Sequence, residues 1–378
     1  MIKVGVTGQE GFIGTHLFNT LGLYPDKYIR IPFYDTFFSD KEKLIRFVSS
    51  CDVIVHLAAM NRHNDPKIIY STNILLVKQV IEACELSHST PYIIFSSSTQ
   101  EERDNLYGKS KKEGYKLFEK WARTSGARFT GLVIPNVFGP FGKPYYNSVV
   151  ATFCYQLTHN EKPKIEVDSE IKLINVGDLV DFILDKINMS CSFKIDEIIE
   201  RCEIPYAYAI KVSELLKKLN SFKEQYFKDG IIPDLSNPFD RNLFNILLTY
   251  NDHNSFFPFH LKQYKDKRGS FVEILKLNSR GQVSFSITNP GNIRGNHFHT
   301  RKAERFAVIK GKAKIEFRRV GTTEKFTFKL DGNKPSFVDM PVWYTHKITN
   351  VGTDMLYTIF WISEHFDPSD PDTFFELV

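Results

Sequence analysis

The sequence has few cysteines, and nothing in their spacing suggests a shared role. The chain of 378 residues contains five of them, scattered and odd in number, with no CxxC pair. A disulfide scaffold is therefore not expected, whereas reduced thiols in a cytoplasmic protein are. Long hydrophobic runs are also missing, since no segment approaches the roughly 18 apolar residues of a membrane span. The opening letters, MIKVGVTG, indicate a strand and not a signal peptide, because no basic stretch precedes an apolar one.

Charge of one sign is not in large excess either. Lys and Arg number 49 against 44 Asp and Glu, which gives a formal net charge of +5. That balance is too mild to indicate a nucleic-acid partner, whereas an anionic small molecule suits it. The composition is 42% hydrophobic and 25% charged, as in ordinary soluble proteins. The length exceeds what one hydrophobic core usually serves, so two domains are expected.

The hydrophobic pattern changes along the chain. Up to about residue 185, short apolar runs alternate with helical patterns, which predicts a Rossmann-type α/β domain with a parallel sheet between helices. Its expected strands are IKVGVTG, YIRIP, DVIVHLAA, YIIFSSS and FTGLVIP. Residues 186–250 are more helical and less regular. From about residue 256, strand follows strand without helices, which predicts an all-β sandwich or barrel. We expect domains over residues 1–255 and 256–378.

Glycines follow the first expected strand in the pattern GxxGxxG, as Gly8, Gly11 and Gly14. Glycine at these positions permits a tight turn and lets backbone N–H groups approach a pyrophosphate at a helix N-terminus. Phe12 and Ile13, which would open that helix, are expected beside the same cofactor. The position after the first strand of an alternating pattern predicts a dinucleotide site.

Tyr107 and Lys111 are four residues apart, so on a helix they share one face. A neighbouring ammonium favours the phenolate, so we expect Lys111, helped by a cationic nicotinamide, to lower the pKa of Tyr107. The pair follows the strand end IIFSSSTQ. Ser98 is the favoured hydroxyl for a bond to the substrate oxygen, with Ser97 and Thr99 as alternatives.

The motifs TGQEGFIG, VHLAAMN, FSSS, YGKSK and PNVFGP resemble the extended short-chain dehydrogenase/reductase family over about residues 1–250. The resemblance implies a Ser/Tyr/Lys active site, with Leu57 and Ala58 near the cofactor ribose and adenine, and Asn136 of PNVFGP near the substrate. Family members that dehydrate nucleotide sugars carry an Asp-Glu pair where this chain has Thr99 and Gln100, which argues against dehydration.

The choice between NAD and NADP stays open at the second strand. A dinucleotide fold usually ends that strand with an acidic residue for a ribose hydroxyl or a basic residue for a 2′-phosphate. Arg30 lies inside the expected strand and Asp35 lies beyond it, so neither is placed to decide.

A second motif lies near the C-terminus, in the stretch IRGNHFHTRKAERFAVIKG. Residues i and i+2 of a strand face the same way, so His297 and His299 point into one space. Glu304 and the more distant His346 could join them if each lies on a neighbouring strand. Three imidazoles and a carboxylate suit Zn²⁺, Fe²⁺ or another divalent first-row metal.

The spacing around these ligands resembles the cupin family over about residues 258–378. Within it, RGNH also resembles sugar-nucleotide 3,5-epimerases, in which the histidine after such an arginine removes a proton beside a ketone. A metal ligand cannot offer a free imidazole as a base, so His297 has one role or the other. The ligand role is favoured because the base role leaves His299, Glu304 and His346 unexplained. The base would then be another residue, with Lys302, Tyr344 and His365 as candidates.

Over its whole length the chain resembles the bifunctional CapF-type enzymes of capsular and O-antigen polysaccharide synthesis, in motifs that include VHLAAMNR, DKRGSFVEI, GNHFH and FDPSDPDTFFELV. The resemblance implies a UDP-linked 2-acetamido-2,6-dideoxy-4-ketohexose as substrate. The cupin half would epimerise C3, and the other half would reduce C4 with NADPH, or with NADH as the alternative, giving UDP-N-acetyl-6-deoxy-L-talosamine. It further implies zinc, a homodimer, and sugar-nucleotide contacts from Lys143, Asn147 and Ser148.

Two other functions stay open on the sequence alone. One is an epimerase without net redox that keeps NAD⁺ bound. The other is a non-enzymatic regulator that senses a nucleotide and is stabilised by a metal.

Overall fold

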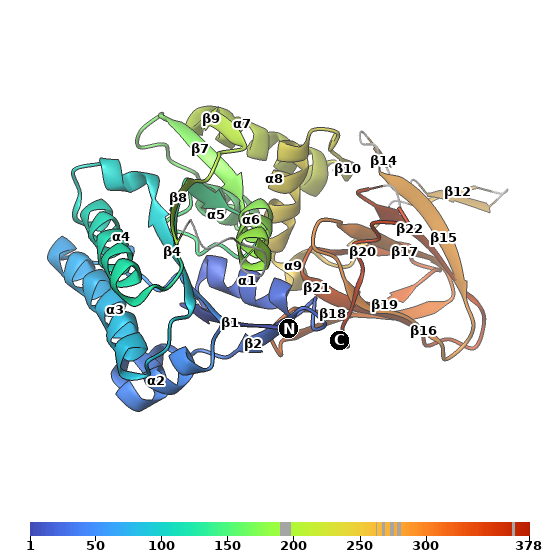
Figure 1. Ribbon diagram of the computed structural model, residues 1–378. Coiled ribbons are helices and arrows are strands. Elements are labelled where there is room, and N and C mark those ends of the chain that lie inside the picture. The colour runs from blue at the N-terminus through green and yellow to red at the C-terminus, as the bar shows by residue number, and fades with distance from the viewer. Residues whose placement is uncertain (190–197, 262, 267–268, 273–275, 278–280, 365–366) are drawn as a thin grey trace. The chain divides into compact units, whose positions relative to one another are not determined.

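The computed structural model describes the chain except residues 190–197, 262, 267–268, 273–275, 278–280 and 365–366 (Figure 1). It divides into two compact units. The first unit comprises Met1–Phe138, Tyr145–Ser148 and Glu170–Ile210, and the second comprises Gly139–Pro144, Val149–Ser169 and Lys211–Val378. No helix in the described part of the chain is long and apolar enough to cross a membrane.

The first unit is built on a parallel sheet whose strands lie in the order β2-β1-β3-β4-β5-β8. All five segments expected as strands belong to it. The bounds are β1 (Ile2–Thr7), β2 (Tyr28–Ile31), β3 (Val53–His56), β4 (Tyr92–Ser98), β5 (Phe129–Ile134) and β8 (Ile199–Glu203). A smaller sheet has the order β6-β7-β9, with β6 (Asn136–Phe138), β7 (Glu170–Asn175) and β9 (Tyr208–Lys211).

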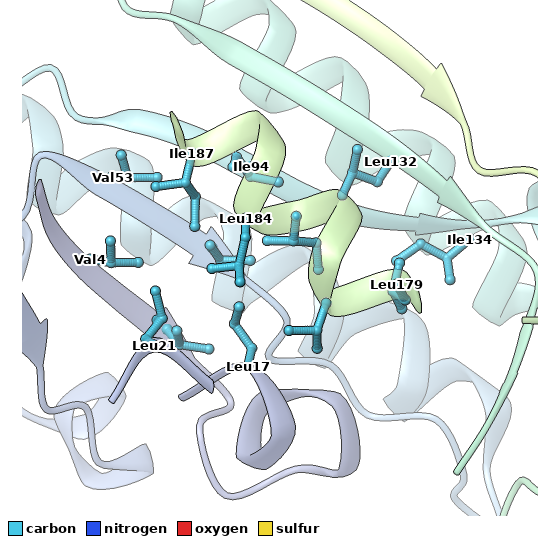
Figure 2. Packing of buried hydrophobic residues seen from close by; sticks show 14 of the residues in the cluster. Val4, Leu17, Leu21, Val53, Ile94, Leu132, Ile134, Leu179, Leu184 and Ile187 are labelled. Carbon is cyan, nitrogen blue, oxygen red and sulfur yellow. The ribbon is translucent and has the colours of Figure 1, made fainter. Parts of the chain in front are cut away.

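Helices cover both faces of the large sheet, as Figure 1 shows. On one face α1 (Phe12–Leu21) and α6 (Val176–Met189) bury Leu17 and Leu179 against the strands (Figure 2). On the other lie α2 (Lys41–Ser49), α3 (Pro66–Leu86) and α4 (Leu106–Ser125), with Val80 and Phe118 in their core. Full burial of such a side chain stabilises the fold by about 1.5–3 kcal/mol. The alternating pattern therefore predicted the α/β/α layers correctly.

The second unit combines helices with the all-β region. Its helices are α5 (Val149–Thr158), α7 (Val212–Phe222), α8 (Pro238–Thr249) and α9 (His253–Phe256), and a π-helical turn, η3 (Lys223–Lys228), follows α7. Two short 3-10 helices, η1 (Asp35–Ser39) and η2 (Thr99–Glu102), belong to the first unit. In the described part of the chain no helix follows α9, and the domain boundary expected between residues 255 and 256 stays a prediction.

The all-β region consists of two antiparallel sheets, as expected for a cupin fold. One has the order β11-β20-β17-β22-β15 and the other β19-β18-β21-β16-β23. The bounds are β11 (Phe259–His260), β15 (Gln282–Thr288), β16 (Ile293–Phe298), β17 (Glu304–Lys310), β18 (Lys312–Arg319), β19 (Lys325–Asp331), β20 (Ser336–Met340), β21 (Tyr344–Asn350), β22 (Leu356–Ile362) and β23 (Phe374–Phe375). Outside them, β12 (Gln263–Asp266) pairs with β13 (Gly269–Val272), and β10 (Ile231–Ile232) pairs with β14 (Lys276–Leu277).

A buried ion pair anchors the strand that carries Glu304. The next residue, Arg305, donates hydrogen bonds of 2.9 and 3.1 Å to the carboxylate of Asp339 on β20. Its guanidinium lies 3.8 Å from the ring centroid of Phe337 and 5.2 Å from that of Tyr226 in η3. Because side chains alternate along a strand, Arg305 and Glu304 point to opposite faces of β17. The Arg305–Asp339 ion pair therefore stabilises the outer face of the strand while Glu304 faces inward.

Two buried histidines make stability depend on pH. His56 is fully buried and its pKa is lowered to about 3, while His253, packed against Phe257 and Phe317, has its pKa lowered to about 4, in both cases mainly by burial. In the unfolded chain both would bind protons near pH 6.5, so acid favours unfolding. We expect the free energy of unfolding to fall by about 2 kcal/mol per histidine between pH 7 and pH 5.

Urea unfolding at several pH values measures this loss. A His253→Phe variant should show a shallower pH dependence, whereas His63→Gln, at an exposed position, should match the unsubstituted protein. Equal pH slopes for all three proteins would contradict the assignment to His253.

Candidate active site and metal centre

The glycine-rich turn after β1 packs closely against the loop that follows β3. Gly8 has a φ of +69°, and a Cβ there would lie 2.8 Å from the backbone nitrogen of Ala58. A Cβ on Gly14 would lie 2.1 Å from the carbonyl oxygen of Gly8. Gly11 precedes α1, and no side chain caps the N-terminus of that helix, where Phe12 and Ile13 begin. Backbone N–H groups at such a terminus suit a phosphate.

The sheet order reverses at this turn, because β1 is flanked by β2 on one side and β3 on the other. Ligands of open α/β sheets bind at the carboxyl ends of strands where the order reverses. Leu57 and Ala58 follow β3 there, and their backbone nitrogens donate to the carbonyl and hydroxyl oxygens of Thr7 at 3.2 and 3.4 Å. The structure thus brings the glycines and the loop after β3 together, and the residues present fit a dinucleotide.

The positions of Arg30 and Asp35 in the structure do not decide between NAD and NADP. Arg30 donates a 3.3 Å hydrogen bond to the carbonyl of Phe18 in α1 and lies over the Phe18 ring. Asp35 is exposed at the start of η1. Neither position distinguishes a ribose hydroxyl from a 2′-phosphate.

Tyr107 and Lys111 lie on the first turns of α4, which begins with Asn105 accepting a 2.7 Å hydrogen bond from the backbone nitrogen of Gly108. Lys111 Nζ donates to the carbonyl oxygen of Ser96 at 2.8 Å and lies 5.9 Å from the centroid of the Tyr107 ring. A Cβ on Gly108 would lie 2.0 Å from the carbonyl oxygen of Gln100, so the start of α4 packs tightly on η2.

Burial dominates the electrostatics of this pair. It lowers the pKa of the Lys111 ammonium to about 7 and raises the pKa of Tyr107 to about 12, with the nearby Tyr146 as a smaller cause for Tyr107. The expectation that Lys111 lowers the pKa of Tyr107 is therefore wrong for the protein by itself. The ammonium is directed at a strand carbonyl, and its own charge is disfavoured by burial. The phenol stays protonated at neutral pH.

The three candidate hydroxyls differ in their surroundings. Ser97 is buried and donates a 2.5 Å hydrogen bond to Glu101, which is paired with Arg201. Ser98 is half-buried, and its oxygen accepts a 3.2 Å hydrogen bond from the backbone nitrogen of Gln100. Thr99 is exposed in η2. The Ser97 hydroxyl is thus engaged in a structural network, which leaves Ser98 as the better candidate.

The expected sugar-nucleotide contacts do not all fall in one unit. Asn136, at the start of β6, and Asn147 are exposed in the first unit, where Ser148 is half-buried. Lys143 is exposed and belongs to the second unit.

Four side chains converge between the two sheets of the all-β region. His297 on β16 is directly paired with His346 on β21, and His299 lies one residue beyond β16. Glu304 begins β17, in the opposite sheet. One potential ligand atom from each residue lies within 4.8 Å of the others. The structure therefore brings together all four residues that the spacing suggested.

The donor atoms at the centre of this cluster have the arrangement that a cation needs. Glu304 Oε2 lies 2.9 Å from His346 Nε2 and 3.3 Å from His299 Nε2. These three atoms are buried and have no assigned hydrogen-bond partner among the described residues. The opposite ring nitrogens, Nδ1 of His299 and Nδ1 of His346, lie 2.5 and 3.2 Å from the carbonyl oxygens of Asp372 and Tyr344. A proton on each Nδ1 leaves the Nε2 lone pairs free, so the residues fit a divalent metal.

The electrostatics favour an ionised carboxylate at the centre of this cluster. Burial alone would raise the pKa of Glu304, but contacts with His299 and His346 outweigh it and hold that pKa well below its usual range. Burial, followed by the two other histidines, lowers the pKa of His297 to about 4. For His299 the effect of burial is outweighed by Glu304, which raises the pKa.

The alternative arrangement, with Arg294 and His297 as an epimerase pair, finds less support. Arg294 is exposed and donates a 3.0 Å hydrogen bond to Thr288. An imidazole with a pKa near 4 is also a weak base at neutral pH. Of the other candidate bases, Lys302 is buried, and its Nζ lies 2.5 Å from the carbonyl oxygen of Pro371. Burial raises the pKa of Tyr344 to about 12. His365 lies outside the described residues.

Two groups near these sites carried no clear signal in the sequence. Asp372 lies beside His299, and Glu101 with Arg201 braces the end of β4. Asp372 contacts a residue 73 positions away, and Glu101 contacts one 100 positions away. The sequence alone therefore shows that these two residues are acidic but not which residues they contact.

Comparisons with known proteins agree with both halves. The chain matches the NAD dependent epimerase/dehydratase family over residues 4–190 and the polysaccharide biosynthesis C-terminal domain over residues 264–374. It is 33% identical over 374 residues, 99% of this chain and 98% of the relative, to UDP-2-acetamido-2,6-beta-L-arabino-hexul-4-ose reductase of Pseudomonas aeruginosa.

Solved structures show the same relationship. The capsular polysaccharide assembling protein CapF from Staphylococcus aureus covers 100% of both chains with a TM-score of 0.62 and 33% identity. UDP-glucose 4-epimerase from Thermotoga maritima covers 59% of this chain and 82% of its own, with a TM-score of 0.50 and 23% identity, which shows the fold alone.

A Rossmann-type unit with a dinucleotide turn, joined to a cupin sandwich, defines the chain as an NAD(P)-dependent nucleotide-sugar enzyme of the reductase and epimerase class. Full-length similarity narrows this class. The chain belongs to the CapF family of capsular polysaccharide enzymes.

Proposed function

We propose that this chain is a bifunctional enzyme of nucleotide-sugar synthesis. Its cupin domain, residues 256–378, epimerises C3 of a UDP-2-acetamido-2,6-dideoxy-4-ketohexose, and its reductase domain, residues 1–255, reduces the C4 ketone with NADPH. The product is UDP-N-acetyl-6-deoxy-L-talosamine, on the route to N-acetyl-L-fucosamine for capsule or O-antigen. The observation that carries this proposal is full-length similarity to a relative named as a reductase of a UDP-linked acetamido hexul-4-ose.

The chemistry of a 4-keto sugar explains why two sites would share one chain. A ketone at C4 makes the C3 proton acidic, so a base can remove it and a proton can return to the opposite face. Reduction of the same ketone removes that acidity and fixes the new configuration at C3. The reductase thus traps the product of the epimerase.

In the reductase domain, bound NADPH supplies the hydride for C4. Tyr107 donates its phenolic proton to the oxygen on C4, and burial keeps that proton in place at neutral pH. Ser98 donates a hydrogen bond to the same oxygen. Lys111 holds the cofactor ribose and helps to reprotonate Tyr107. The expected cofactor contacts are Gly8, Gly11, Phe12, Ile13, Gly14, Leu57 and Ala58, and the expected sugar-nucleotide contacts are Asn136, Lys143, Asn147 and Ser148.

In the cupin domain, His297, His299, Glu304 and His346 hold a divalent metal, which we propose to be Zn²⁺. Three imidazoles and one carboxylate form a donor set that zinc accepts. A bound zinc ion acts as a Lewis acid toward a ketone oxygen. The protein supports the site by burying Glu304 and by fixing the Nδ1 side of His299 and His346.

A coupled assay tests the proposed reaction. Purified protein, NADPH and the 4-ketohexose nucleotide should give a loss of nicotinamide absorbance that stops when the nucleotide sugar is left out. If absorbance stays constant with all components present, the reductase half of the proposal is wrong. Protein that purifies with NAD⁺ and inverts C3 without consuming NADPH would favour an epimerase without net redox.

We also propose a homodimer, supported by an apolar row on the edge strand β15. Val283, Phe285 and Ile287 alternate along it and are 47%, 69% and 40% exposed. Among the described strands β15 is the last of its sheet, and an exposed apolar row on such a strand favours contact with another chain. A Phe285→Asp variant should therefore shift the protein toward a monomer, measured by light scattering. Ser284→Asp, on the alternate face of the same strand, is the control, and a Phe285→Asp protein of unchanged mass would contradict this interface.

The protein is proposed to act in the cytoplasm. Among the described residues, Cys51, Cys84, Cys154 and Cys202 are free thiols, and the first three are buried. Free thiols of this kind suit a reducing compartment.

A further inference from the structure

A buried carboxylate lies next to the proposed metal centre without belonging to it. Asp372 is 3% exposed and accepts three hydrogen bonds from the turn that follows His299. The donors are the backbone nitrogen and hydroxyl of Thr300, at 3.0 and 2.6 Å, and the backbone nitrogen of Arg301, at 3.0 Å. Bonds from several donors to one buried carboxylate are strong and fix its position.

The backbone of Asp372 contacts a metal-site residue directly. Its carbonyl oxygen lies 2.5 Å from Nδ1 of His299, whose Nε2 lies 3.3 Å from Glu304. The φ angle of Asp372 is +38°, which few residues other than glycine adopt. Such a conformation persists where the surroundings hold it, and here the side chain supplies that hold.

We infer that Asp372 is a positioning residue of the metal site, whose side chain places its own carbonyl so that His299 presents Nε2 to the metal. Partners of the second ring nitrogen fix the tautomer and orientation of a metal-bound histidine. The inference rests on the proposed metal site and extends it to a residue that binds no metal itself.

The segment around Asp372 has independent contacts that should survive its substitution. Phe374 and Phe375 form β23, which pairs with β16 at Phe298 and His297. Further along, the backbone nitrogen of Glu376 donates to Asn296 at 2.9 Å. Loss of the Asp372 carboxylate should therefore leave the segment docked while releasing the ring of His299.

The test is the zinc affinity of the full chain, measured by competition with a chromophoric chelator. Asp372→Ala should raise the dissociation constant by about 10- to 100-fold. Asp367→Ala is the matched control, because Asp367 is an exposed aspartate of the same C-terminal segment whose side chain accepts hydrogen bonds from the backbone nitrogen and the hydroxyl of Ser369. That control should bind zinc like the unsubstituted protein.

A milder variant covers the case in which Asp372→Ala fails to fold. Thr300→Val removes the 2.6 Å bond to Asp372 and should weaken zinc binding less, but in the same direction. The absorption spectrum of the Co²⁺-loaded protein should also change in each folded variant, because the ring of His299 is reoriented.

The outcomes separate this inference from the proposed function. Unchanged affinity and an unchanged cobalt spectrum in the folded variants would overturn the role of Asp372 alone. An unsubstituted protein that takes up neither zinc nor cobalt would overturn the metal site and this inference together.

Discussion

Replacing Tyr107 by phenylalanine is expected to lower the rate of NADPH oxidation with the 4-ketohexose nucleotide by roughly 10²- to 10⁴-fold, the usual contribution of a positioned acid. The variant keeps the ring and its burial but lacks the proton that the oxygen on C4 must receive. Because the pKa of Tyr107 is raised to about 12, nearly all of the phenol is protonated at neutral pH and available to donate. The measurement is the steady-state rate at saturating NADPH.

Tyr115→Phe is the matched control for that variant. Tyr115 lies on the same helix, and its ring packs against Phe129, so the substitution removes a phenolic hydroxyl to which no catalytic role is assigned. The control should keep its rate, and the Tyr107→Phe protein should still exchange the C3 proton of the substrate with deuterated water. A Tyr107→Phe rate within about threefold of the unsubstituted protein would contradict the assigned role.

Replacing Glu304 by glutamine is expected to weaken metal binding by more than about 100-fold, because even the partner of a ligand contributes about 10- to 100-fold. Glutamine keeps the size of the side chain but removes the negative charge. It also brings an amide group to within reach of two histidine nitrogens that now lie 2.9 and 3.3 Å from Glu304 Oε2. Metal content after dialysis, measured by elemental analysis, should fall toward zero.

Glu316→Gln provides the control, since Glu316 lies on β18 and pairs with Lys314 and Lys347 away from the histidines. This protein should retain its metal. The Glu304→Gln protein should lose exchange of the C3 proton, because the proposed epimerase site depends on the metal. Full metal content in Glu304→Gln would contradict the proposed ligand set.

Three of the four clustered residues could be predicted from local spacing, whereas His346 lies 42 positions beyond Glu304. His297 and His299 share one face of a strand by the period of two, and Glu304 starts the next strand after a short turn. The same holds for Gly8 and Gly14, which can be placed from their position after an apolar strand. Patterns that depend on neighbouring residues are visible in a single sequence.

Other features depend on contacts that a sequence does not display. Asp372 reaches His299 across 73 positions, and Glu101 reaches Arg201 across 100. The raised pKa of Tyr107 is a result of burial, which a single sequence does not display. Lys143 belongs to a different compact unit from Asn147, although only three residues separate them.

The most direct test of the bifunctional proposal is the structure of the product formed from the 4-ketohexose nucleotide and NADPH in deuterated water. NMR should show an inverted C3 that carries solvent deuterium, and a C4 that carries a hydroxyl and the hydrogen delivered from unlabelled NADPH. A product with protium and the original configuration at C3 would contradict the epimerase half. A C4 ketone that persists after full incubation would contradict the reductase half.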